Sequence, residues 1–280
     1  MRLGGTIVGP WDSPEQWEQL LVQSRFRAVT APFNCRTPRD EVRAYMEIAR
    51  RRDVTVAEIG VWKNPFDPDP EAAAEALAYA RGQLALADEL GIACCVNIVG
   101  TASRAGWDAA DRSNFTPGTY ARVVDSIRGI IDSVRPKRAF YCIEPMPWMV
   151  PDSPDAYLQL LRDVDRPQFG AHMDFVNMIN CPRRFLDAEN FVEECFSKLA
   201  AHIRSTHIKD IRMPPTRLTT VLEEVSPGEG ALDYAEVLRT MARWLPPEAP
   251  VLLEHMTTDA EYRAAYDYVA AKAAEAGVEI

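Results

Sequence analysis

The chain has 280 residues, which is above the roughly 250 residues at which an ordinary single core stops growing but within reach of one (β/α) barrel. Apolar residues make up 47% of it and charged residues 26%, with only 14 glycines, and this composition excludes a disordered chain. The formal net charge of -10 would repel a phosphate backbone, so we expect no nucleic-acid partner.

The N-terminus and the apolar runs give no sign of a membrane segment. Residues 1–17 contain one arginine and a very short apolar stretch, unlike a signal peptide. No apolar run approaches the roughly 18 to 20 residues that cross a bilayer. The six cysteines lack CxxC spacing and are expected to be reduced and mostly buried. We therefore expect a cytoplasmic protein with no membrane partner.

Eight short apolar runs alternate with helical patterns from end to end, which is typical of parallel strands joined by crossover helices. We predict strands at residues 3–8, 28–33, 54–60, 93–100, 139–145, 168–174, 203–210 and 250–255. Three helices begin with a capping hydroxyl followed by proline, at Ser13-Pro14, Thr37-Pro38 and Ser153-Pro154. The other helices are predicted at 71–90, 116–135, 187–200, 232–243 and 258–276.

This alternation over the whole chain predicts one domain, residues 1–280, folded as a single (β/α)8 TIM barrel. A doubly wound open sheet is the alternative. The first strand leads into GPWDSPE and not into a glycine-rich dinucleotide loop, which argues against that alternative. No Walker A sequence or G-x-S-x-G nucleophile elbow is present.

Polar residues end the last four predicted strands, and reacting groups of a (β/α)8 barrel lie at the carboxyl ends of its strands. These residues are Glu144, Asp174, His207 and Glu254. Three unpaired carboxylates at one mouth would repel one another, so a positive charge is expected among them. Three oxygen ligands and one nitrogen suit a divalent ion such as Mn, Mg, Co, Fe or Zn. His202 and His255 are weaker candidate ligands, the latter because its side chain should point away from that of Glu254.

Strand alternation and loop position add candidate substrate contacts. His172 shares a strand face with Asp174, so it contacts the site or is a core histidine. Lys209 lies above His207 and either polarises a substrate oxygen or pairs with a nearby acid. The remaining candidates, which ordinary loop packing would also explain, are Asn97, Asn177, Trp62 and Trp148.

Five motifs resemble the xylose isomerase-like TIM barrel family, which includes sugar phosphate isomerases and epimerases, ketose 3-epimerases and inosose isomerases. They are CIEPMPW around Glu144, AHMDFVN around Asp174, STHIKD around His207, SPGEGALDY after it, and VLLEH around Glu254. The resemblance implies that these four residues bind one divalent metal, commonly Mn. It also implies that Glu144 and Glu254 act as acid and base on opposite faces of a carbohydrate or cyclitol.

The chemistry implied is proton transfer α to a carbonyl through an enediolate stabilised by the metal. Two departures from the ketose 3-epimerase pattern are Asn177, where relatives have histidine, and the lack of a glutamate after the strand-five motif. One alternative is the catalytic subunit of a C-glycoside deglycosidase, a lyase acting on 3-keto glycosides. Another is a non-catalytic barrel that binds a metal or a sugar. The resemblance also implies a homo-oligomer or a small partner subunit.

Overall fold

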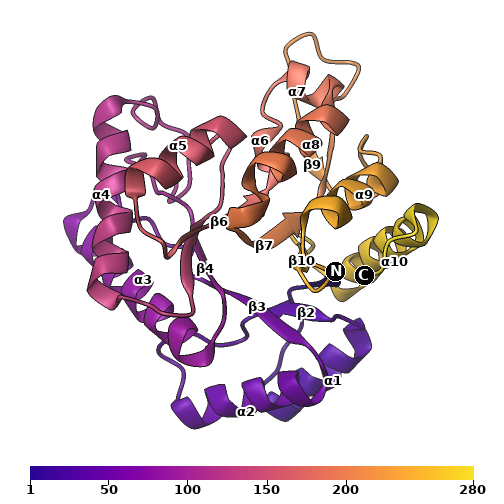
Figure 1. Ribbon diagram of the computed structural model, residues 1–280, viewed down its shortest axis with the longest axis horizontal. Coiled ribbons are helices and arrows are strands. Elements are labelled where there is room, and N and C mark those ends of the chain that lie inside the picture. Colours follow the sequence, from indigo (N-terminus) through magenta and orange to yellow (C-terminus); the bar gives the residue numbers. More distant parts are fainter.

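Eight parallel strands close into a barrel in the computed structural model, which describes residues 1–280 (Figure 1). The order around the barrel is β1-β10-β7-β6-β5-β4-β3-β2, and every neighbouring pair is parallel. The barrel strands are β1 (Arg2–Gly5), β2 (Ala28–Thr30), β3 (Thr55–Gly60), β4 (Cys94–Asn97), β5 (Phe140–Ile143), β6 (Phe169–Asp174), β7 (Ile203–Ile208) and β10 (Pro250–Leu253). The predicted (β/α)8 barrel is confirmed.

Eight longer helices surround the barrel in Figure 1. They are α1 (Pro14–Ser24), α2 (Arg39–Arg51), α3 (Pro70–Leu90), α4 (Pro117–Val134), α5 (Pro154–Val164), α8 (Ala188–Leu199), α9 (Tyr234–Trp244) and α10 (Asp259–Ala276). Ser13 and Ser153 cap α1 and α5 as predicted. The predicted cap at Thr37 is wrong. The helix begins one residue later with Pro38 at the N-cap, because the Thr37 hydroxyl instead accepts a hydrogen bond from the Asn34 backbone at 3.1 Å.

The structure adds short elements that the hydrophobic pattern did not predict. They are α6 (Phe175–Met178), α7 (Pro182–Leu186), a 3-10 turn (Ala200–His202) and the antiparallel pair β8 (Asp210–Arg212) and β9 (Glu223–Val225). The predicted strand 203–210 therefore ends at Ile208, where the chain leaves the barrel.

The Asp210 carboxylate explains why the chain turns at this point. It accepts hydrogen bonds from its neighbour Ile211 and, across the SPGEGALD turn, from the backbone N–H groups of Gly228, Gly230 and Leu232. One buried side chain thus holds the turn that follows β9.

The main core lies between the strands and the helices, with Trp17, Leu84 and Tyr157 fully buried. All six cysteines are free, and four of them are buried. The two chain ends lie side by side in Figure 1, where the Met1 amino group donates to the Glu279 carbonyl at 2.6 Å. None of the helices is both long enough and apolar enough to cross a membrane.

Candidate metal centre and pocket

The barrel brings together the four residues predicted to bind metal, which we call the mouth cluster: Glu144, Asp174, His207 and Glu254. Asp174 and His207 are direct neighbours across β6 and β7, while Glu144 follows β5 and Glu254 follows β10. Each offers one ligand atom, and these atoms all lie within 4.8 Å of one another.

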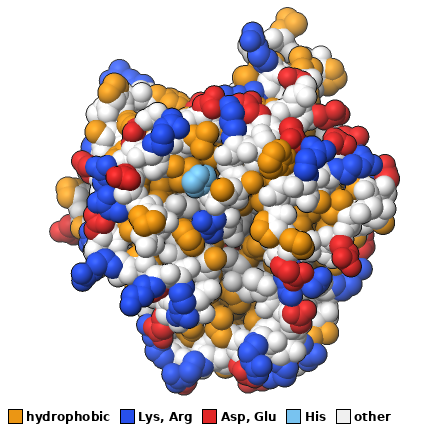
Figure 2. Space-filling view, in the orientation of Figure 1, with side chains coloured by type: hydrophobic (Ala, Val, Ile, Leu, Met, Phe, Trp, Pro, Cys, Tyr) orange, Lys and Arg blue, Asp and Glu red, His pale blue; other side chains and the backbone are white.

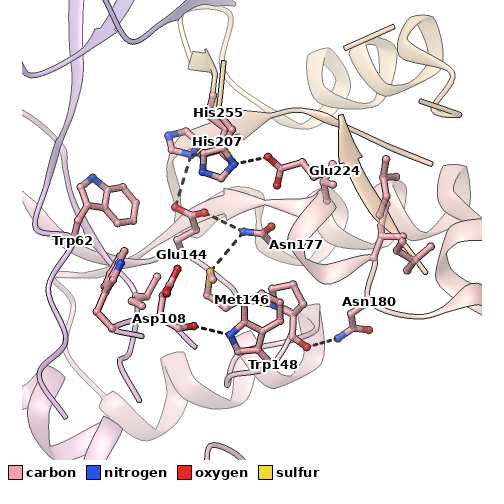
Figure 3. Close-up of a pocket in the computed structure, with 18 of the residues that line it drawn as sticks. Trp62, Asp108, Glu144, Met146, Trp148, Asn177, Asn180, His207, Glu224 and His255 are labelled. Atoms are coloured by element: carbon pink, nitrogen blue, oxygen red, sulfur yellow. Dashed lines mark hydrogen bonds and ion pairs between the residues drawn. The ribbon is translucent and has the colours of Figure 1, made fainter. Parts of the chain in front are cut away.

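Three atoms of the mouth cluster are buried without a hydrogen-bond partner: Glu144 Oε2, Asp174 Oδ2 and His207 Nδ1. The second carboxylate oxygen of Glu144 and of Asp174 does accept a hydrogen bond. Asp174 Oδ1 caps α6 by accepting from the Asn177 backbone at 3.0 Å, and Glu144 Oε1 accepts from the Asn177 amide at 3.1 Å (Figure 3). Asp174 Oδ2 and His207 Nδ1 each have a charged neighbour at 2.7 Å, Lys209 and Glu254, whereas Glu144 Oε2 has no polar neighbour closer than 3.7 Å. A converging set of oxygen and nitrogen atoms of this kind could hold a divalent cation.

Buried Lys209 supplies a fixed positive charge beside the mouth cluster. Its Nζ lies 2.6 Å from Glu254 Oε1 and 2.7 Å from Asp174 Oδ2, the second in an orientation that makes an ion pair without a hydrogen bond. It also lies 3.1 Å from Glu224 of β9. Burial alone would lower the pKa of Lys209, but these carboxylates raise it well above its ordinary value, so the lysine is charged.

Glu58, in the middle of β3, is a site residue that the sequence reasoning missed. Its carboxylate contacts His207 Nε2 and His172 Nε2, each at 3.0 Å, and accepts from the Ser205 hydroxyl at 2.6 Å. Burial would raise the pKa of Glu58, but the two histidines outweigh it and hold that pKa well below its ordinary value. A carboxylate can only accept, so it keeps a proton on His207 Nε2 and turns Nδ1 toward the mouth cluster, where Glu254 Oε2 lies 2.7 Å away. Burial would lower the pKa of His207, but Glu254 and Glu58 raise it well above its ordinary value.

The two glutamates of the mouth cluster have different electrostatic surroundings. Burial and the nearby Glu254 raise the pKa of Glu144 well above its ordinary value. Burial would also raise the pKa of Glu254, but His207 and Lys209 outweigh it and lower that pKa. His207 Nδ1 lies 2.7 Å from Glu254 Oε2 and 3.7 Å from Glu144 Oε2. The imidazole therefore lies between the two carboxylates.

A cavity of about 840 Å³ opens above the mouth cluster. Among the residues predicted to bind substrate, Trp62, Trp148 and Asn177 line it. In Figure 3, Glu144 lies between Trp62 on one side and Asn177 on the other. The same pocket contains Glu224, which no sequence pattern singled out because it lies on the unpredicted strand β9.

Three residues predicted to bind substrate do not line the pocket: Asn97, His172 and Lys209. The Asn97 amide is used within the protein, where it accepts from the Lys63 N–H at 3.1 Å and donates to the Lys63 carbonyl at 3.0 Å. His172 is fully buried on Glu58. Strand alternation predicts which face a side chain occupies but not whether neighbours cover it, and these three side chains are buried.

His255 differs from its predicted orientation. The strand ends at Leu253, and His255 has a left-handed backbone with φ of 62°, so strand alternation no longer applies. Its side chain lines the pocket and pairs with Glu224 (Figure 3). His202 lies in the 3-10 turn before β7 and takes no part in the mouth cluster.

The model of the xylose isomerase-like TIM barrel family matches residues 19–272, and the chain belongs to that family. No curated protein matches the sequence closely enough to count as a relative.

Several solved structures share the fold at low sequence identity. An L-ribulose 3-epimerase superimposes with a TM-score of 0.72 and 13% identity, covering 99% of this chain and 95% of that one. The 3-keto-D-glucoside 4-epimerase from E. coli gives 0.70 and 13%, covering 97% and 99%. A xylose isomerase-like protein from Mycobacterium smegmatis in complex with magnesium gives 0.68 and 14%, covering 98% and 97%.

Proposed function

We propose that the protein is a divalent-metal-dependent isomerase or epimerase that moves a proton next to the carbonyl of a carbohydrate or cyclitol. The observation that carries this proposal is the mouth cluster, whose three carboxylates and one imidazole bring four ligand atoms within 4.8 Å of one another beside a large pocket. Three carboxylate oxygens and one imidazole nitrogen fit a divalent ion, and we favour Mn²⁺. The epimerase structures that share the fold agree with this class of reaction.

A metal ion bound there would polarise a substrate carbonyl and make the neighbouring C–H more acidic. The chain supplies the groups that move the proton. Glu144 and Glu254, which follow strands β5 and β10, both line the pocket. In the barrel, β5 and β10 are separated by β6 and β7, which carry Asp174 and His207. The two carboxylates thus approach a bound ring from different sides. One can remove the proton and the other return it, to the opposite face in epimerisation or to the adjacent carbon in isomerisation.

Buried neighbours hold these carboxylates in position. Asn177 fixes one oxygen of Glu144, and Lys209 fixes one oxygen of Glu254. Each glutamate therefore keeps its second oxygen directed at the cluster. The positions are set by packing before substrate arrives, which lowers the reorganisation required during proton transfer.

Deuterium exchange tests the proposal directly. The Mn²⁺-loaded protein is incubated in heavy water with a panel of keto sugars and inososes, and loss of the α-proton signal is followed by NMR. We expect metal-dependent exchange with at least one compound, reduced by about 10²–10⁴-fold in Glu254→Gln. Glu223→Gln makes the same change in a surface glutamate of β9 that pairs with Arg212 and lies outside the pocket, so it is the matched control and should keep full exchange. Exchange that is unchanged in Glu254→Gln would refute the role of this residue.

A further inference from the structure

Three exposed tryptophans gather at the same pocket: Trp62, Trp107 and Trp148. Each leaves about two fifths of its side chain exposed, at 38%, 43% and 38%. Partly exposed aromatic rings that gather at one cavity offer flat apolar faces that a ligand can cover. Figure 2 shows hydrophobic side chains around a central histidine on this face, with most lysines and arginines toward the edge.

The Trp62 ring is held in place by a constrained backbone. Trp62 has a left-handed φ of 46°, which is rare for a bulky residue. Its indole lies directly on Gly60, where a Cβ atom would come within 2.0 Å of Nε1. The two hydrogen bonds between Asn97 and the Lys63 backbone fix the next residue. The fold thus tolerates strain to present this ring to the pocket.

Trp148 is fixed in a different way. Its Nε1 donates to the Asp108 carbonyl at 2.7 Å, and its own carbonyl accepts from the Asn114 amide at 3.1 Å (Figure 3). Nearby amides are also satisfied within the protein, since Asn180 donates to the Pro147 carbonyl at 3.2 Å. This side of the pocket therefore offers the flat apolar faces of three indoles, and the Trp148 N–H and the Asn114 and Asn180 amides are already paired within the protein. Such a surface suits an aromatic ring better than a second sugar, whose hydroxyls need partners.

The charges around the pocket argue against a phosphorylated ligand. Its lining contains five acidic side chains and no lysine or arginine. Lys209 is buried and already faces three carboxylates. Lys63 lies over the Tyr79 ring and 4.0 Å from Glu75, on helix α3. A phosphate group would therefore find no lysine or arginine in the lining to pair with.

The size of the pocket agrees with a ligand of two parts. About 840 Å³ lies in the upper range of small-molecule sites, so one sugar ring over the mouth cluster leaves the tryptophan side unfilled. We infer that the substrate is an uncharged glycoside with a ketone on its sugar ring, whose flat aromatic group stacks on Trp62, Trp107 and Trp148 while the sugar ring lies over the mouth cluster. This inference rests on the proposed function for the placement of the sugar.

Paired glycosides test the aromatic subsite by equilibrium binding, without turnover. Isothermal titration calorimetry on the Mn²⁺-loaded protein compares phenyl and methyl glycosides of glucose, galactose and xylose, with cellobiose and glucose 6-phosphate as further probes. We expect at least one phenyl glycoside to bind about tenfold more tightly than its methyl partner. Trp148→Ala and Trp62→Ala should lose that preference. The control Trp244→Ala, equally exposed on α9 but outside the pocket, should keep it.

Each remaining outcome overturns the inference. Equal binding of every phenyl and methyl pair, no detectable phenyl glycoside binding, or a preference that survives both pocket variants would exclude an aromatic subsite. Tighter binding of cellobiose would assign the tryptophans to a second sugar, and tighter binding of glucose 6-phosphate would contradict the charge argument. Failure of the proposed function is read separately, in the heavy-water exchange assay, because the phenyl preference does not depend on proton transfer.

Discussion

Replacing Glu58 by glutamine should weaken metal binding at the mouth cluster, although Glu58 is not itself a member of that cluster. The carboxylate faces two imidazole Nε2 atoms at 3.0 Å each and the Ser205 hydroxyl at 2.6 Å. Glutamine keeps the shape but exchanges one acceptor oxygen for an NH₂ donor. If that donor faces His207, the imidazole proton must move to Nδ1, the atom that points at the mouth cluster. A protonated Nδ1 cannot bind a metal ion.

Loss of such a supporting carboxylate typically lowers metal affinity by about 10–100-fold, or about 1.4–2.7 kcal/mol. We expect a loss in this range when the Mn²⁺ affinity of Glu58→Gln is measured by competition with a chelator. Ser205→Ala is the matched control, because it removes one hydrogen bond to Glu58 but leaves both imidazoles facing a carboxylate. Its affinity should fall by about threefold or less. Wild-type affinity in a folded Glu58→Gln protein would refute the orienting role of Glu58.

Three further predictions concern the scaffold and are measured by urea unfolding. Gly4→Ala should destabilise the barrel by about 3 kcal/mol or more, because the new Cβ would lie 1.6 Å from the Ala28 carbonyl oxygen. The control Gly118→Ala has open space around the new Cβ and should unfold like the wild type. Asp210→Ala should cost about 2–4 kcal/mol by leaving the SPGEGALD turn without its acceptor, and equal stability would contradict that role. Tyr157→Phe should cost about 1–2 kcal/mol, since its hydroxyl donates to the Ile143 carbonyl of β5, and an unchanged midpoint would show that this bond is not stabilising.

The barrel could be predicted because its signals are local and repeated. Each strand is a short apolar run, and helix starts such as Ser13-Pro14 and Ser153-Pro154 are written in adjacent residues. The four strand-end residues of the mouth cluster were predictable for the same reason, since the fold places every strand end at one mouth. Their role as metal ligands stays a prediction.

The remaining parts of the site depend on contacts between distant segments. Glu58 lies inside an apolar strand run, and only closure of the barrel places it beside Ser205 and His207, about 150 positions away. Glu224 reaches the pocket through the β8–β9 hairpin, whose three-residue strands are too short for a periodic signal. Asn97 looked like a pocket residue from its position, but its amide is used to hold the Lys63 backbone.

The most direct test of a metal-dependent site is the metal content of the purified protein, measured by elemental mass spectrometry beside Asp174→Ala. Asp174 is the informative position because Oδ2 is one of the buried atoms without a hydrogen bond and Asp174 is a direct strand neighbour of His207. We predict about one Mn, Co, Fe or Zn per wild-type chain and its loss in the folded variant. No metal in the wild type even after incubation with Mn²⁺, or full occupancy in Asp174→Ala, would contradict the metal centre and the function built on it.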